Sequence, residues 1–351
     1  MMELDWISCV NKWASFERSL VYRELHPAQI VGLVWDKQAD DTWSPFLVIG
    51  DESRRVPIDP DALKQLILFL AKKRFPDVEI RFPTSWYWKH DSPYAELVRS
   101  VLTSSVAPPQ DPTQDSGYKE ICDSPPVCLY SDKKIIAVVS AQYTIVCISD
   151  SLSNVPPERV EPCGWKVMEF YLSPDVSFLR VYNPTNNISL CFVNGYTGRE
   201  AVKVYMGIGV VSNEQRTWID MILPSKKGTG FRVIHRGRLA SELDVADFFS
   251  PEMVSRMQHV IEYLQNKTLT EEDIDFLRTN LKGVNVELRP NTPALAAIQA
   301  ISRALIGNEK DNNKARRLLV ARRCGQIAVE LLQRERIDPG YNLWTSESEA
   351  W

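Results

Sequence analysis

The spacing of the apolar residues changes near residue 239, and this change limits the folds that the chain can adopt. Before it, β-branched residues gather in short runs separated by turn sequences such as NPTNN and NGYTG. We expect strands there at Lys134 to Ile148, Phe178 to Tyr182, Ile188 to Val193, Val202 to Val211 and Gly230 to Ile234. After it, apolar residues recur every three or four positions, and we expect helices at Met253 to Gln265, Thr292 to Leu305 and Asn312 to Arg336. The sequence therefore predicts an α+β fold with a central antiparallel β-sheet and a helical C-terminal third.

The first hundred residues mix strand and helix signals. Residues 30–35 and 45–49 read as buried strands, and Asp59 with Pro60 marks the start of a helix. This N-terminal α/β portion covers residues 1–103. A stretch rich in Pro, Ser and Asp then predicts a loop or linker at 104–126. The remaining units are a β-rich central domain at 127–238, a helical region at 239–337 and a flexible tail at 338–351.

Positive charge is concentrated in two segments of an acidic chain. The net charge is −4, which excludes a uniformly basic surface. Residues 201–238 nevertheless contain seven Lys and Arg against two acidic residues, and residues 303–336 contain nine against four. A local basic face built from both segments is therefore expected.

Cysteine and histidine usage argues against disulfides and metal centres. The chain has seven cysteines, an odd number, with no CxxC pair, and its four histidines are far apart. We expect reduced thiols and a cytoplasmic protein, placed in a bacterial host cell by the resemblance given below. The N-terminus lacks the pattern of a secretory signal, and no apolar run approaches the ~20 residues of a membrane span.

No catalytic motif is present in the sequence. The phosphate-binding loop, the nucleophile elbow, the HExxH zinc motif and the dinucleotide fingerprint are all missing. The Gly207-Ile-Gly209 fragment is typical of a strand with small residues. We therefore expect no catalytic residues, no metal and no cofactor.

The strongest functional signal is the segment KKGTGFRVIHRGR, where three glycines separate six cationic side chains. Lysine and arginine bind phosphates, and glycine allows a nucleic-acid backbone to approach closely. The predicted phosphate contacts from this segment are Lys226, Lys227, Arg232, His235, Arg236 and Arg238. Those from the second basic segment are Arg316, Arg317, Arg322 and Arg323.

Aromatic residues near these segments suggest binding of single strands, because unpaired bases stack on exposed rings. The stacking candidates are Tyr143, Tyr196 and Trp218. A separate cluster, Trp86-Tyr87-Trp88, is suited either to docking a protein partner or to packing as a hydrophobic cluster against the first domain.

Five short motifs occur in the order found in one known family. They are DALKQL at 61–66, IAVVSAQY at 136–143, NGYTG at 194–198, VVSNE at 210–214 and FRVIHRGR at 231–238. Over about residues 55–335 the chain thus resembles the phage/plasmid-like protein family known as domain of unknown function nine-three-two. Gly195 and Tyr196 replace the Ser-Glu pair of that family, and Ser212 stands where it has Cys. The resemblance implies an origin in phages or plasmids, often near replication and recombination genes, and no established activity.

The main hypothesis is a non-enzymatic protein that binds nucleic acid, mainly single-stranded DNA, in replication or recombination of a phage or plasmid. Homo-oligomerisation is compatible with this role. One alternative is an interaction protein that binds a host defence or transcription factor. Another is a metal-dependent nuclease whose carboxylates are scattered in the sequence.

Overall fold

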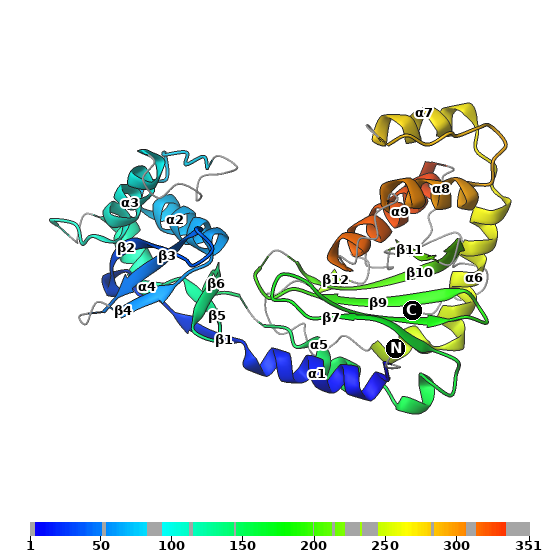
Figure 1. The fold of residues 1–351 in the computed structure, drawn as a ribbon, viewed down its shortest axis with the longest axis horizontal. Helices are drawn as coiled ribbons and strands as arrows, with labels where there is room; N and C mark the ends of the chain where they lie inside the picture. The colour runs from blue at the N-terminus through cyan, green and yellow to red at the C-terminus, as the bar shows by residue number, and fades with distance from the viewer. Residues whose placement is uncertain are drawn as a thin grey trace.

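The chain forms two lobes, each with a hydrophobic core of its own, in the computed structural model (Figure 1). The structure describes residues 4–50, 54–82, 93–111, 115–143, 145–198, 200–212, 215–221, 232–233, 245–281, 284–306 and 314–334. The first lobe contains the elements from Val21 to Val139. The second contains helix α1 (Trp6–Ser19) and the elements that follow residue 145.

The first lobe combines two small antiparallel sheets with three helices. One sheet has the order β2 (Ile30–Lys37), β3 (Trp43–Ile49), β4 (Arg54–Pro57), and the other has the order β1 (Val21–Glu24), β5 (Val127–Ser131), β6 (Lys134–Val139). The 3-10 turn η1 (Pro27–Gln29) precedes β2, and the helices are α2 (Pro60–Arg74), α3 (Pro93–Val106) and α4 (Ser116–Asp123). Helix α2 begins as the sequence predicts, because the Asp59 side chain accepts a hydrogen bond from the Asp61 backbone N–H.

The segment 104–126, where the sequence predicted a loop or linker, contains the end of one helix and the whole of another. Helix α3 continues to Val106, and α4 follows after Asp115. The Asp115 side chain caps α4 by accepting from Tyr118 N–H at 2.8 Å, and Ile121 anchors the helix in the core. The described residues between the helices, 107–111, are non-helical, in agreement with the loop expected there.

The second lobe is built on a six-stranded antiparallel sheet. Its strands are β7 (Lys166–Tyr171), β8 (Ser177–Asn183), β9 (Ile188–Asn194), β10 (Val202–Ser212) and β11 (Gln215–Met221), with β12 (Arg232–Val233) pairing with β10. The helices are α1, α5 (Ile148–Ser153), α6 (Pro251–Asn266), α7 (Glu271–Asn280), α8 (Ala294–Ile306) and α9 (Lys314–Arg334), with 3-10 turns η2 (Pro157–Arg159) and η4 (Val245–Phe249). An α+β fold with antiparallel sheets and a helical C-terminal region is thus confirmed.

Both faces of this sheet are covered by helices. On one face Leu179, Phe192 and Val204 belong to the large core that includes α1, α5, α6 and α8. On the other face α9 crosses the strands, with Leu318 against Phe178, Cys191 and Tyr205. Strands β8 and β9 are therefore buried along their whole length, which explains why their residues do not alternate between apolar and polar.

The sequence predictions for the C-terminal third are close to the observed helices. Thr270 and Asp273 form a reciprocal capping box at the start of α7, as their spacing predicts. The predicted strand at 134–148 is shorter than expected, because β6 ends at Val139 and α5 begins at Ile148. The predicted strand at 230–234 is described only at Arg232–Val233, and the tail at 338–351 lies outside the described residues.

Helix α1 has no counterpart among the sequence predictions. Its buried residues Trp6, Cys9, Val10, Trp13 and Glu17 recur at helical spacing, and Asp5 caps it by accepting from Ser8 N–H. Helix α1 lies along the second lobe and leads directly into β1 of the first lobe (Figure 1).

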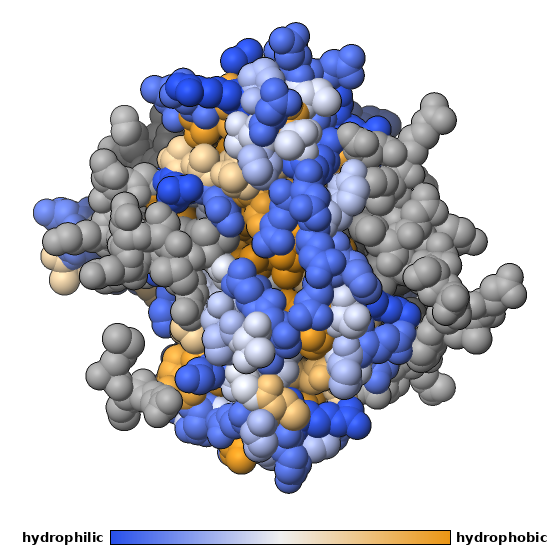
Figure 2. Space-filling view, turned by 90° about the vertical axis from the view of Figure 1, so that its right-hand side faces the viewer, coloured by the Kyte–Doolittle hydropathy of each residue, from blue (hydrophilic) through white to orange (hydrophobic). Residues whose placement is uncertain are grey.

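The side of the second lobe that carries α6 is mainly hydrophilic, with a narrow apolar strip along its middle (Figure 2). Helix α6 turns Met257, Val260 and Leu264 into the core and leaves polar residues outside. In the part of the chain that the structure describes, no helix combines the length and the apolar character that crossing a membrane requires.

Candidate functional site

The described residues of the first basic segment lie near helix α9, which carries the second one. Strand β12 pairs with β10, so that Arg232 lies opposite Lys203 in the ladder. Helix α9 packs across the same sheet, where Arg322 Nη1 lies 2.7 Å from Glu200 Oε2. Tertiary structure therefore brings together parts of the chain that are far apart in sequence, and a basic face shared by both segments stays a prediction.

The outer face of α9 is cationic. Lys314, Arg316 and Arg323 are exposed, and Arg317 is half-buried. Leu319, between the two exposed arginines, keeps 62% of its surface accessible. Arg316 and Arg323 are two helical turns apart, so this face presents an Arg-Leu-Arg stripe to solvent.

Arg322 does not belong to this exposed stripe, although the sequence predicted a phosphate contact there. Its side chain is largely buried, its guanidinium lies 5.0 Å from the ring centroid of Tyr205, and it pairs with Glu200. Burial alone would raise the pKa of Glu200, but the charges of Arg322 and Lys203 outweigh this effect and lower it. Arg322 thus forms an internal ion pair, because its side chain lies on the face of α9 that packs against the sheet.

Most residues of the first basic segment lie outside the described part of the chain. They are Lys226, Lys227, His235, Arg236 and Arg238. Of Arg232, the structure describes the backbone pairing with β10. The cluster Trp86-Tyr87-Trp88 is also outside the described residues.

The three stacking candidates do not present open rings. Tyr196 and Trp218 are buried in the core, with 0% and 4% of their surface exposed. Tyr143 is half-buried and stacks on Tyr22, with 6.0 Å between the ring centroids. The prediction that Tyr196 and Trp218 stack on bases is therefore wrong, because Tyr196 packs against α1 and the first lobe and Trp218 packs beneath α9.

A buried ion cluster under α9 has no counterpart among the sequence predictions. Arg180 is fully buried in β8, its Nη2 lies 2.7 Å from Asp220 Oδ2 on β11, and its Nε lies 2.8 Å from Glu169 Oε2 on β7. The guanidinium also lies 4.8 Å from the ring centroid of Trp218. A buried arginine gains stability only when its charge is paired, and the two carboxylates supply that pairing.

The Gly207-Ile-Gly209 fragment lies in strand β10, as the sequence predicted. A Cβ atom on Gly207 would lie 2.3 Å from the carbonyl oxygen of Ile219, and one on Gly209 would lie 2.7 Å from the ring of Tyr182. These glycines therefore make room for neighbouring strand atoms and rings beneath α9.

A second buried polar cluster lies where the two lobes meet. The Glu17 carboxylate on α1 accepts hydrogen bonds from Tyr196 Oη, from the backbone N–H groups of Ile148 and Ser149, and from the Ser149 hydroxyl. Trp13 Nε1 donates to the same Tyr196 hydroxyl at 2.7 Å. Burial raises the pKa of Glu17 above its ordinary value of 4.5, and these hydrogen bonds only partly oppose the shift.

Replacement of Glu17 by glutamine is expected to remove part of the pH dependence of stability. Because the pKa of Glu17 is raised by folding, the folded state holds a proton that the unfolded state has lost above pH 4.5. The free energy of unfolding of the wild type should therefore fall, relative to Glu17→Gln, as the pH rises from 4.5 through the folded pKa. Urea unfolding between pH 4.5 and 8 measures this difference. Glu262→Gln, at an exposed position of α6, is the control and should leave the pH profile unchanged.

Carboxylates and thiols do not gather into a metal site in the described residues. No group of three or more His, Cys, Asp or Glu side chains is placed there to hold an ion.

Comparison with protein-family models, curated proteins and solved structures gives no match for this chain.

Proposed function

We propose that this protein binds nucleic acid through the phosphate backbone, along the exposed face of α9 and the adjoining β10–β12 edge. The observation that carries this proposal is the group of exposed cations Lys314, Arg316 and Arg323 on α9. Contacts of this kind are independent of base sequence and draw their free energy from the release of counterions.

The local acidic residue does not oppose such binding. Glu200 lies beside Arg322, and it is already paired with both Arg322 and Lys203. Its charge is therefore balanced inside the protein.

The burial of Tyr196 and Trp218 changes the proposed mode of binding. Without open rings, bases have no stacking platform in the described part of this face. Phosphate contacts alone would serve single and double strands alike, so the preference for single strands rests on the sequence pattern. Replication or recombination of phage or plasmid DNA is the context that the family resemblance suggests.

The double substitution Arg316→Ala with Arg323→Ala tests the interface. If both side chains touch phosphate, the slope of log K against log salt concentration should become shallower by about 1.4 for single strands and about 1.8 for duplex DNA. Fluorescence anisotropy with labelled single- and double-stranded oligonucleotides, titrated at several salt concentrations, measures both slopes.

The matched control is Arg278→Ala with Arg289→Ala. These two arginines are exposed in the same lobe and lie outside α9, with side chains 66% and 75% accessible. This variant loses the same formal charge and should keep the wild-type slope. Equal slopes for all three proteins would remove α9 from the interface, and no binding by the wild type at low salt would refute the proposed function.

A further inference from the structure

One side of α9 carries a stripe of side chains that face solvent. Its members recur every three or four residues, which is the spacing of a single helical face. In chain order they are Arg316, Leu319, Arg323, Gln326, Glu330 and Gln333. All are exposed except Glu330, which is half-buried. In this stripe, which the structure describes in full, Leu319 is the one apolar side chain.

The packing of α9 fixes the outward direction of Leu319. Its neighbours Leu318 and Val320 are buried, with 2% and 9% of their surfaces exposed. Leu319 keeps 62% of its surface accessible, the largest value among the exposed large apolar side chains of the described residues. A rotation of α9 that hid Leu319 would pull Leu318 out of the core. The apolar surface of Leu319 is therefore available to a molecule that lies on α9.

Two arginines of the stripe flank Leu319. Arg316 lies one turn before it and Arg323 one turn after it, and their Cα atoms are about 10 Å apart along the helix axis. A strand whose phosphates contact both arginines would pass directly over Leu319. The nucleotide between those phosphates would therefore face an apolar side chain rather than a third charge.

The second half of the stripe is less favourable to phosphate. Gln326 Nε2 donates a hydrogen bond to Glu330 Oε1 at 2.8 Å, so this amide and this carboxylate are engaged with each other. Like charges repel, and the Glu330 carboxylate would oppose any phosphate that continued in this direction. Leu319 thus lies in the middle of the part of the stripe that suits a phosphate backbone.

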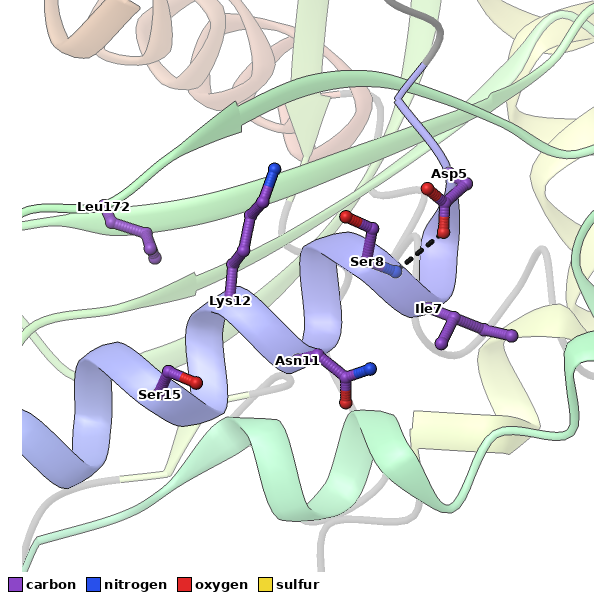
Figure 3. Close-up of a pocket in the computed structure, with 7 residues that line it drawn as sticks. All are labelled: Asp5, Ile7, Ser8, Asn11, Lys12, Ser15 and Leu172. Atoms are coloured by element: carbon purple, nitrogen blue, oxygen red, sulfur yellow. Dashed lines mark hydrogen bonds between the residues drawn. The ribbon is translucent and has the colours of Figure 1, made fainter.

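Another exposed apolar residue of the same lobe has a different electrostatic setting. Ile7 on α1 is 54% exposed and lines a cavity of about 720 Å³. Figure 3 shows Asp5 and Lys12 among the residues around this cavity, so charges of both signs are present there. Ile7 also lacks arginines one turn before and one turn after it. Exposure alone therefore does not distinguish Leu319, whereas its place between two exposed arginines does.

We propose that Leu319 contacts a base of a bound single strand, between two phosphates held by Arg316 and Arg323. This contact rests on the proposed function and assigns single-stranded nucleic acid as the preferred ligand of the same face. In a single strand the faces of the bases are accessible to an apolar side chain, whereas in a duplex they are stacked on one another. An apolar contact adds affinity without adding charge, so a salt titration separates it from the phosphate contacts.

The test compares two fluorescein-labelled strands of equal length, oligo-dT and a strand of abasic deoxyribose phosphates. Both carry the same phosphates, but only the first has bases. The full-length wild type should bind oligo-dT about tenfold more tightly than the abasic strand in anisotropy titrations, because a base covers the exposed part of Leu319. Leu319→Gln should weaken binding of oligo-dT by about tenfold and leave binding of the abasic strand unchanged. The salt slopes for both strands should stay at the wild-type values, since no charge is lost.

Three measurements serve as controls for this substitution. Glutamine and leucine have similar helix propensities, so α9 should stay folded in Leu319→Gln, which circular dichroism checks. Leu319→Met keeps an apolar side chain and should retain most of the affinity for oligo-dT. Ile7→Gln removes an exposed apolar side chain elsewhere in the same lobe and should bind both strands like the wild type.

Failure of this contact is distinguishable from failure of the phosphate interface. Leu319→Gln would overturn the contact if it bound oligo-dT like the wild type, or if it lost oligo-dT and the abasic strand to the same extent. Weakening of duplex binding by the same factor would overturn the preference for single strands. In each of these cases a shallower salt slope in Arg316→Ala with Arg323→Ala would still support the phosphate interface. An unchanged slope in that double variant would remove α9 from the interface, and Leu319 with it.

Discussion

Gly325→Ala is expected to lower the free energy of unfolding by about 3 kcal/mol or more, because it forces α9 away from the sheet. A Cβ atom at this position would lie 1.6 Å from the carbonyl oxygen of Asp220 and 2.8 Å from the backbone nitrogen of Met221. These are backbone atoms of β11, so no side-chain rotation can relieve the clash. Thermal unfolding followed by circular dichroism measures the effect as a lower midpoint.

The control for this substitution is Gly32→Ala in β2. A Cβ atom on Gly32 meets nothing within 4 Å, so the same chemical change should be nearly neutral there. Equal stability of Gly325→Ala and Gly32→Ala would show that α9 does not approach β11 as closely as described.

Asp220→Asn is expected to lower the free energy of unfolding by about 3–5 kcal/mol, because it removes the main counter-charge of a fully buried arginine. Arg180 makes two hydrogen bonds to the Asp220 carboxylate, and both side chains have 0% of their surface exposed. Glu169 alone would then have to balance the guanidinium. Urea unfolding at neutral pH gives the free energy directly.

Two further variants show whether the buried charge causes this loss. Arg180→Met combined with Asp220→Asn removes the unpaired guanidinium and should recover part of the lost stability. Asp36→Asn breaks the exposed ion pair with Arg55, in which Arg55 Nη1 lies 2.9 Å from Asp36 Oδ2. It should lower the free energy of unfolding by less than about 1 kcal/mol. A double variant less stable than Asp220→Asn would contradict the explanation.

Local signals in the sequence predict much of the secondary structure. The start of α2 at Asp59 and Pro60 and the capping box of Thr270 and Asp273 depend on residues next to one another, so short-range rules find them. Helix α1 has equally regular apolar spacing and could have been recognised from Trp6, Val10 and Trp13. Predictions of this kind require no knowledge of tertiary contacts.

Features that depend on distant partners could not be predicted in the same way. The sequence shows Arg180 within an apolar strand, but its partner Asp220 lies 40 positions further along the chain. Tyr196 and Trp218 were candidates for base stacking, and only the packing of Tyr196 against α1 and the first lobe and of Trp218 beneath α9 reveals that they are buried. Likewise, the pairing of β5 with β1 assigns residues 127–139 to the first lobe, whereas their strand pattern alone suggested the central domain.

For the candidate interface, the sequence correctly indicates two basic segments but not the orientation of each side chain. Arg316, Arg322 and Arg323 are close in sequence, yet Arg322 faces the sheet and the other two face solvent. The difference arises from the helical period and from Glu200, 122 residues away.

The position of α1 ahead of the first lobe has a consequence for synthesis on the ribosome. Trp6 and Trp13 emerge before the first lobe, whereas core partners such as Leu152, Phe192 and Phe249 emerge after it. The core of the first lobe is formed from residues between Leu25 and Val138, so that lobe can begin to fold while α1 still lacks its partners. A nascent chain paused at this stage would expose the apolar face of α1, which a chaperone that binds such helices would recognise.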